Sequence, residues 1–218
     1  MSRPLPVLSS SLSHTRTRMA RPNQLHEKRS ELLPIVAKAF AELGYRRATT
    51  AELAERCGVQ QNILYRLWPD KRAMFIAALG YVFDLAVEIW SRVLAKGGPG
   101  TTAARLLAYE SENIGKFGNH RIIFAGLNET DDPEIRAALA GMYSRYHRFV
   151  RDHVVDHRGK RGKAAAEEAD LIAWAIIGLG TVTTISKELG LQDPSARRMT
   201  MHSMGSLLLD GSAGTGRT

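Results

Sequence analysis

The most constraining feature of the sequence is the spacing of its apolar residues, which recur three and four positions apart. Leu32, Val36, Phe40 and Leu43 follow this spacing and therefore share one face of a helix over residues 28–43. Gly44 is expected to end that helix, because glycine tolerates the left-handed conformation common after a helix C-terminus. No stretch alternates apolar and polar residues over the length of a strand. The sequence therefore predicts an all-α fold.

Capping signals divide the chain into about nine helices. Thr49 and Glu52 have the spacing of a capping box, and Asp70 is placed to cap a long helix. Asp132 and Asp193 each precede a proline, which is well placed in the first turn of a helix. The predicted helices cover residues 28–43, 50–57, 61–67, 71–96, 102–116, 120–128, 133–158, 164–188 and 194–209.

The charge of the chain is concentrated at its N-terminal end. The whole chain carries a formal charge of +8, and residues 1–75 alone hold 13 Lys and Arg against 6 Asp and Glu. Such an excess favours an anionic partner, either nucleic acid or a membrane surface. We therefore expect a disordered basic arm over 1–27, a compact basic domain over 28–75, a larger helical domain over 76–210 and a flexible tail over 211–218.

Composition indicates a soluble protein of the cytoplasm. Cys57 is the one cysteine, which excludes a disulfide within the chain, and we expect it to be a buried filler. The longest uncharged stretch, residues 171–186, is shorter than the roughly 20 residues of a membrane-spanning helix. We expect no membrane-spanning segment, and the N-terminus lacks the apolar core of a secretory signal.

The motif with the clearest chemistry spans residues 49–67, where a tight turn at Gly58 joins two short helices. This layout is typical of a helix-turn-helix, in which the second helix enters the major groove of DNA. That second helix begins with Gln60, Gln61 and Asn62 and continues to Arg66. Amide side chains can pair with adenine and arginine with guanine, so these residues are candidates for reading base edges.

The same region resembles the DNA-binding domain of the TetR family of bacterial transcription regulators. The resemblance covers about 45 residues and rests on short matches in the family's order: Ala39-Phe40, Gly44-Tyr45, Ala48-Thr49-Thr50, Leu53-Ala54, Gly58-Val59, Leu64-Tyr65 and Lys71. The remaining residues match only in helical layout. Trp68 departs from the family pattern, and we expect it to be a core wedge, with a weak DNA contact as the alternative.

The resemblance implies roles for individual residues. Tyr45, Thr50 and Lys71 would contact phosphates, and Tyr65 would lie against the backbone or the bases. Together with the base-reading candidates, the expected DNA-contacting set is Tyr45, Arg46, Thr49, Thr50, Gln60, Gln61, Asn62, Tyr65, Arg66 and Lys71.

For the C-terminal domain, the resemblance implies a homodimer and a pocket for a small-molecule effector. Small and adaptable residues on the last two helices are the expected dimer contacts: Ala175, Gly178, Val182, Met201, Met204 and Leu208. Aromatic residues are the candidates for lining the pocket, although each is also compatible with plain core: Phe83, Trp90, Tyr109, Phe117, Phe124, Tyr143, Tyr146 and Trp174.

No catalytic arrangement, cofactor motif or metal site is expected. His153 and His157 lie four residues apart, but their charged neighbours indicate a solvated face. The sequence therefore predicts a homodimeric regulator, most simply a repressor, that binds a palindromic operator in double-stranded DNA and responds to a small effector. The alternative is an all-α carrier of small molecules or lipids whose basic N-terminus docks on anionic membranes. A helical enzyme is a third and weaker interpretation.

Overall fold

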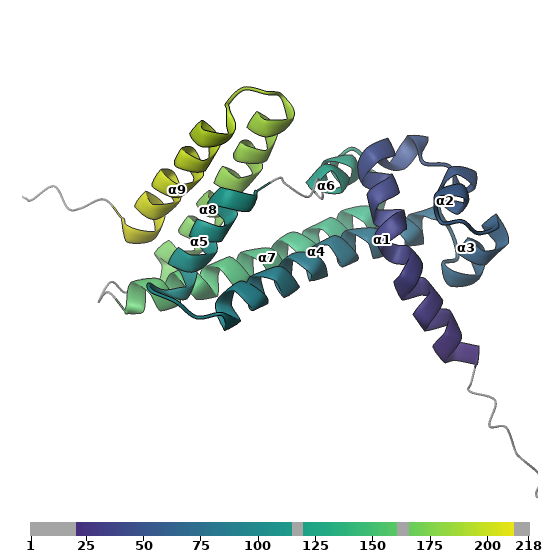
Figure 1. Cartoon of the computed structure of the whole chain (residues 1–218), viewed down its shortest axis with the longest axis horizontal. Coiled ribbons are helices and arrows are strands. Elements are labelled where there is room, and N and C mark those ends of the chain that lie inside the picture. Colours follow the sequence, from purple (N-terminus) through teal and green to yellow (C-terminus); the bar gives the residue numbers. More distant parts are fainter. Residues whose placement is uncertain (1–20, 115–119, 161–165, 212–218) are drawn as a thin grey trace, which may run out of the picture.

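The computed structural model describes residues 21–114, 120–160 and 166–211, and within them the chain is helical throughout, with no strand (Figure 1). The all-α prediction is confirmed. The helices are α1 (Arg21–Arg47), α2 (Thr50–Arg56), α3 (Gln61–Leu67), α4 (Lys71–Ala95), α5 (Thr102–Asn113), α6 (His120–Leu127), α7 (Pro133–Gly159), α8 (Ala166–Glu188) and α9 (Pro194–Asp210).

The first helix differs most from its predicted range. It begins at Arg21 in the described chain, so residues 21–27, which we expected in the arm, are helical. The rest of the expected arm, residues 1–20, lies outside the described residues, as do residues 212–218 of the expected tail. Gly44 interrupts α1 as predicted, with φ 75° and ψ 168°, and a short helical turn follows it.

Side-chain caps mark where several of the other helices begin. Thr49 Oγ1 accepts the amide of Glu52, and Asp70 Oδ1 accepts the amide of Ala73 at 2.7 Å. Asp132 and Asp193 each accept two backbone amides at the starts of α7 and α9. Each of these caps satisfies amides that lack a partner within the helix. The capping signals in the sequence therefore placed these starts correctly.

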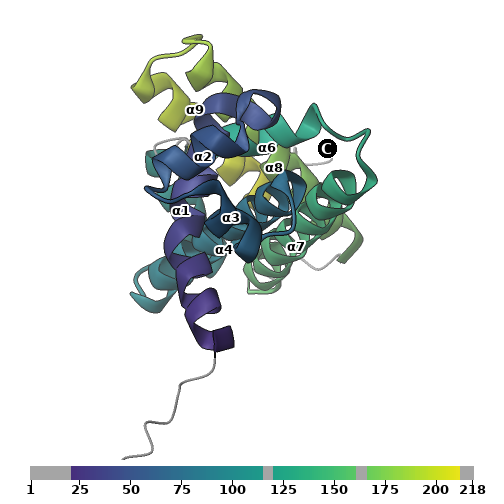
Figure 2. The same ribbon diagram turned by 90° about the vertical axis from the view of Figure 1, so that its right-hand side faces the viewer.

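The molecule is elongated along α4 and α7, which run side by side (Figure 1). Helices α1–α3 cover one end of this pair, as the end-on view in Figure 2 shows. At the other end, α8 and α9 form a helical hairpin that packs on α7 and α5. Helix α6 lies against α1, between the two ends.

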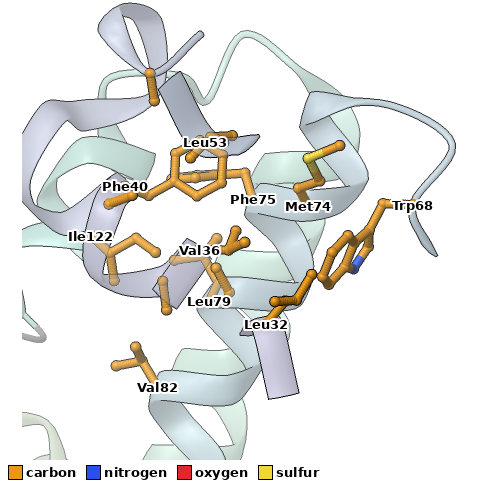
Figure 3. Packing of buried hydrophobic residues seen from close by; sticks show 14 of the residues in the cluster. Leu32, Val36, Phe40, Leu53, Trp68, Met74, Phe75, Leu79, Val82 and Ile122 are labelled. Atoms are coloured by element: carbon orange, nitrogen blue, oxygen red, sulfur yellow. The ribbon is translucent and has the colours of Figure 1, made fainter. Parts of the chain in front are cut away.

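One hydrophobic cluster joins the N-terminal helices to α6 and α7. Phe40 of α1 and Phe75 of α4 meet edge to face, with ring centroids 5.0 Å apart, and Ile122 of α6 is fully buried in the same cluster (Figure 3). Leu139 and Met142 of α7 also belong to it. The boundary expected at residue 75 therefore does not separate two cores.

A second cluster holds the distal end together. It contains Leu107 of α5, Val154 of α7, Ile172 of α8 and Met201 of α9. His157 is buried beside it and links three helix ends, with Thr101 Oγ1 at 2.5 Å from Nδ1 and Asp210 Oδ1 at 2.9 Å from Nε2. The solvated face expected for His157 is therefore wrong, because α5 and α9 cover this side of α7. The C-terminal bundle is thus stabilised by its own apolar core and by the contacts of His157 at the helix ends.

Two helices are long and apolar enough to span a membrane by length and composition, namely α4 and residues 168–188 of α8. Our prediction that no segment meets this criterion is therefore wrong. It considered only wholly uncharged stretches, whereas a spanning helix tolerates one or two charges. In this fold α4 packs against α1, α5 and α7, and α8 packs against α7 and α9. Such packing is also what a core helix of a helical bundle shows.

Two glycines within helices provide a test of the packing. A Cβ on Gly205 of α9 would lie 2.3 Å from Leu107 Cδ1, whereas nothing lies within 4 Å of a Cβ on Gly141 of α7. We expect Gly205→Ala to destabilise the protein by about 1–3 kcal/mol through overpacking. We expect the matched Gly141→Ala to stabilise it by about 0.5–1 kcal/mol, the helix propensity gain. Urea unfolding measures both, and a stabilising Gly205→Ala would contradict this packing of α5 on α9.

Candidate DNA-binding face and interior cavity

Helices α2 and α3 form a helix-turn-helix. The turn between them passes through Gly58, whose φ of 62° suits glycine, and the amide of Val59 returns to the carbonyl of Ala54 at 3.0 Å. Leu53 of α2 and Leu64 of α3 are fully buried and pack the pair onto α1 and α4. The predicted motif is therefore present, and its buried face is apolar.

The opposite face of α3 is polar and exposed. Gln60, Gln61, Asn62 and Arg66 are all exposed, and Tyr65 is 48% exposed. Among the described residues, no hydrogen bond or ion pair holds the Arg66 guanidinium. Exposed amide and guanidinium groups of this kind can bond base edges in a major groove.

Two threonines of the expected DNA-contacting set make hydrogen-bonding contacts within the helix-turn-helix itself. Thr49 is the N-cap of α2, so its hydroxyl already serves the helix. Thr50 Oγ1 lies 3.0 Å from Tyr65 Oη and ties the start of α2 to α3. This contact sets the position of Tyr65 on the exposed face.

Tyr45 and Lys71 contact each other at the start of α4. Lys71 Nζ donates to the Tyr45 carbonyl at 3.1 Å and lies 4.5 Å from the centre of the Tyr45 ring. The ring packs against Phe40 and Phe75, and burial raises the pKa of the Tyr45 hydroxyl. Both expected phosphate contacts are therefore also parts of the structure of the domain.

Ion pairs that the sequence did not reveal join this domain to the turn between α6 and α7. Arg46 Nε donates to Glu129 Oε1 at 2.9 Å. Arg72 contacts Asp132 at 3.4 Å and Glu134 at 3.0 Å. The partners are some 60 to 83 positions apart in the chain, so no local spacing could have indicated them.

Trp68 and Cys57 are core residues, as expected. Trp68 is fully buried between α1, α3 and α4, with the Arg29 guanidinium 5.4 Å from the indole centre (Figure 3). A direct DNA contact by Trp68 is excluded by this burial. Burial also raises the pKa of the Cys57 thiol, although Lys28 acts in the opposite direction.

A cavity of about 130 Å³ lies in the C-terminal bundle, and we call it the larger cavity. Its walls come from α4 to α9. Five of the expected aromatic residues line it: Phe83, Trp90, Tyr109, Tyr143 and Tyr146. A smaller cavity of about 60 Å³ adjoins it and shares Trp90, Glu110, Tyr146 and Met201.

The other three expected aromatic residues do not form part of this lining. Phe124 and Trp174 are absent from the walls of both cavities, and Phe117 lies outside the described residues. Trp174 is 51% exposed on α8 and stacks on His147 of α7, with ring centroids 4.6 Å apart. Its helical position turns it away from the bundle interior, so our placement of Trp174 in a pocket was wrong.

Sequence reasoning missed the charged group of the cavity, Glu110 of α5. Its Oε1 accepts the indole N–H of Trp90 at 2.6 Å, and burial raises its pKa while that hydrogen bond partly opposes the shift. A glutamate in the middle of an amphipathic helix looks like a surface residue in sequence. Only the placement of α4 and α7 around α5 reveals that it points inward.

The hairpin of α8 and α9 carries an exposed apolar face. Leu171, Val182, Leu189 and Met199 are 63% to 73% exposed, and Met204 is 46% exposed. Of the expected dimer contacts, Ala175, Gly178, Val182 and Met204 are exposed and Leu208 is half-buried. Met201 is only 3% exposed, because it lies on the side of α9 that faces α5. Our assignment of Met201 to the dimer surface is therefore wrong.

Comparison with known proteins agrees with this geometry. Residues 37–78 match the family described as bacterial regulatory proteins, tetR family. The chain is 28% identical over 91 residues to the HTH-type transcriptional regulator YuxN of Bacillus subtilis, a match that covers 41% of this chain and 31% of YuxN. It is 24% identical over 160 residues to the nucleoid occlusion factor SlmA of Vibrio vulnificus, covering 69% and 79% of the two chains.

Solved structures share the fold over most of the chain. A TetR-family regulator from Cytophaga hutchinsonii has a TM-score of 0.71 at 14% identity, covering 86% of this chain and 96% of that one. FadR from Bacillus subtilis, solved with stearoyl-CoA, has a TM-score of 0.65 at 15% identity, covering 84% and 98%. A regulator from Saccharomonospora viridis, solved with choline, has a TM-score of 0.69 at 18% identity, covering 82% and 95%.

A helix-turn-helix with an exposed polar second helix, placed at one end of a helical bundle, defines a DNA-binding transcription regulator. The resemblance seen in the sequence is confirmed: residues 37–78 match the tetR family, and the fold is that of solved regulators of this family.

Arg66 provides the sharpest test of the DNA-binding face. If it reads one base pair, Arg66→Ala should cost about 1–3 kcal/mol at that operator position and relax the preference for its base. Fluorescence anisotropy with operator variants measures this. The control is Arg92→Ala, an exposed arginine of α4 that pairs with Glu88. Equal losses on operator and random duplex would instead assign Arg66 to the phosphate backbone.

Proposed function

We propose that this protein is a cytoplasmic, homodimeric repressor that leaves a palindromic operator when a small-molecule effector fills the bundle. The proposal rests mainly on one observation, which is that the core under the DNA-binding face continues into the wall of the larger cavity. Ile122 of α6 is buried in the N-terminal cluster, and its neighbour Ile123 lines the larger cavity. A ligand in the cavity and an operator on the DNA-binding face would therefore act on the same continuous core.

The exposed apolar face of α8 and α9 supports the proposed dimer. Large apolar side chains at 46% to 73% exposure lie together on these helices, and burying such surface favours association. A two-fold dimer would present two copies of α3 to one face of DNA. The operator should then have two half-sites one helical turn apart, about 34–36 Å, or a multiple of that spacing.

Release requires that the effector bind one conformation of the dimer more tightly than the other, since equal affinity would shift nothing. Helix α6 is the element best placed to respond, because it contacts α1 and also lines the larger cavity through His120 and Ile123. A shift of α6 would move the ion pair between Glu129 and Arg46. The spacing of the two recognition helices would change as a result.

The direct test is selection of duplex DNA from a random library by the purified protein at near-physiological salt. We expect enrichment of a palindrome, with affinity that falls steeply as salt rises. Binding without sequence preference would contradict the proposed repressor. Binding to anionic vesicles with no selected DNA would favour the carrier instead.

Val182 tests the dimer surface. We expect Val182→Glu to shift the protein from dimer to monomer in light scattering after size exclusion, because a charge would be buried against an apolar face. Val155→Glu is the matched control, since Val155 is 41% exposed on α7, outside the α8–α9 face. Circular dichroism checks that both variants remain helical. A dimeric Val182→Glu would remove this residue from the interface.

A further inference from the structure

We propose that the effector of the larger cavity is a small organic cation, a protonated or methylated amine with one apolar substituent, and that Glu110 is its counter-ion. This inference rests on the proposed function only in calling the ligand an effector. The binding chemistry itself follows from the lining of the cavity.

Glu110 lies between the larger and the smaller cavity and belongs to the walls of both. One carboxyl oxygen accepts the indole N–H of Trp90 at 2.6 Å. Trp90 is itself held in place by stacking on Tyr146 and Phe149 of α7, at centroid distances of 5.1 and 5.0 Å. The carboxyl group therefore has a fixed position, with its charge directed at an interior space.

Within the described part of the chain, no basic side chain pairs with the Glu110 carboxyl group. Among the described residues, the walls of the two cavities include neither lysine nor arginine. Burial lowers the pKa of His120 and of His153, which favours the neutral form of both rings. A buried carboxylate without a positively charged partner is costly, so the group either becomes neutral or binds a cation.

The other titratable groups around Glu110 are tyrosines. They are Tyr109 on its own helix and Tyr143 and Tyr146 on α7, and burial raises the pKa of all three. The lining residues from α4, α8 and α9 are not titratable. The described surroundings of Glu110 are thus mainly aromatic and apolar, with no lysine or arginine among them.

The aromatic side chains that line the cavity also favour a cationic ligand. The faces of Phe, Tyr and Trp attract ammonium groups, by about 2 kcal/mol or more where water is excluded. The volume of about 130 Å³ is close to that of cavities that admit one benzene ring. An anionic ligand, by contrast, would meet a carboxyl group and no basic side chain in the described lining.

The same geometry links ligand binding to pH. Because burial raises its pKa, Glu110 stays protonated to higher pH than an ordinary glutamate. A cation favours the ionised form, so its binding should release a proton at pH values below the raised pKa. Affinity should then increase by up to about tenfold per pH unit and become constant above that pKa.

Three probes of nearly equal shape test the charge preference: benzylammonium, benzyl alcohol and benzoate. We expect calorimetry on the full-length protein at neutral pH to show benzylammonium binding at least about tenfold more tightly than benzyl alcohol, and no benzoate binding. At acidic pH, where Glu110 is protonated in the free protein, measurements in two buffers of different ionisation enthalpy should show proton release. Affinity for benzylammonium should rise with pH and then become constant, whereas affinity for benzyl alcohol should not rise.

Glu110→Gln keeps the size of the side chain and should remove both the preference for the cation and the proton release. The control is Glu112→Gln, an exposed residue of α5 whose carboxylate lies 3.4 Å from Arg198. Thermal unfolding of both variants checks that they fold. Equal binding of the amine and the alcohol, tighter binding of benzoate, no binding of benzylammonium at millimolar concentration, or an unchanged preference in Glu110→Gln would overturn the proposal.

Selection of DNA with the same protein preparation tests the proposed repressor independently of the cation site. A protein that selects a palindrome but does not prefer benzylammonium would retain the proposed repressor and lose the cation site. A protein that binds benzylammonium through Glu110 without selecting DNA would retain the cation site and lose the repressor.

Discussion

The packing of Phe75 against Phe40, Tyr45 and α6 is the contact on which the rest of the structure depends. Phe75 is fully buried, and its ring lies 5.0 Å from Phe40 and 4.9 Å from Tyr45. Gly126 of α6 closes the other side, where an added Cβ would meet Leu139 at 3.2 Å and Phe75 at 3.4 Å. A helix-turn-helix of this size has little core of its own, so it relies on α6 and α7 for burial.

This arrangement gives the cavity a physical route to the DNA-binding face. Helix α6 places Ile122 in the shared core and Ile123 in the cavity wall. Closely packed interiors switch between discrete arrangements rather than deforming continuously. An effector that repositions α6 would therefore reposition α1 and, with it, the recognition helix. The ion pairs of Arg46 and Arg72 with the α6–α7 turn and the start of α7 run along the same route.

Much of this organisation was readable from local sequence. Caps such as Asp132 and Asp193 placed helix starts because one side chain satisfies amides only a few residues away. The polar face of α3 was readable because a helix separates its two faces at a fixed period. The start of α1 was missed because residues 21–27 carry no apolar period, although they continue the helix in the fold.

Other features depend on contacts between distant helices and had no local signal. Met201 and Met204 are three residues apart on α9, yet one is buried against α5 and the other is 46% exposed. Trp174 was misplaced and Glu110 was missed for a related reason, since the neighbours of a helix decide which of its faces is interior. Local sequence indicates that a helix has two faces and does not tell which helix covers each of them.

The most direct test of this account is urea unfolding followed separately at two tryptophans. Trp68 reports on the core beneath the DNA-binding face, and Trp90 reports on the cavity. Each is isolated by replacing the other tryptophans with phenylalanine, at one protein concentration. Because α6 and α7 join the two regions in one core, we expect both probes to follow a single transition with the same midpoint after correction for the stability of each variant. Clearly different midpoints for the two probes after this correction would show that the DNA-binding domain and the bundle unfold independently, which would contradict the shared core.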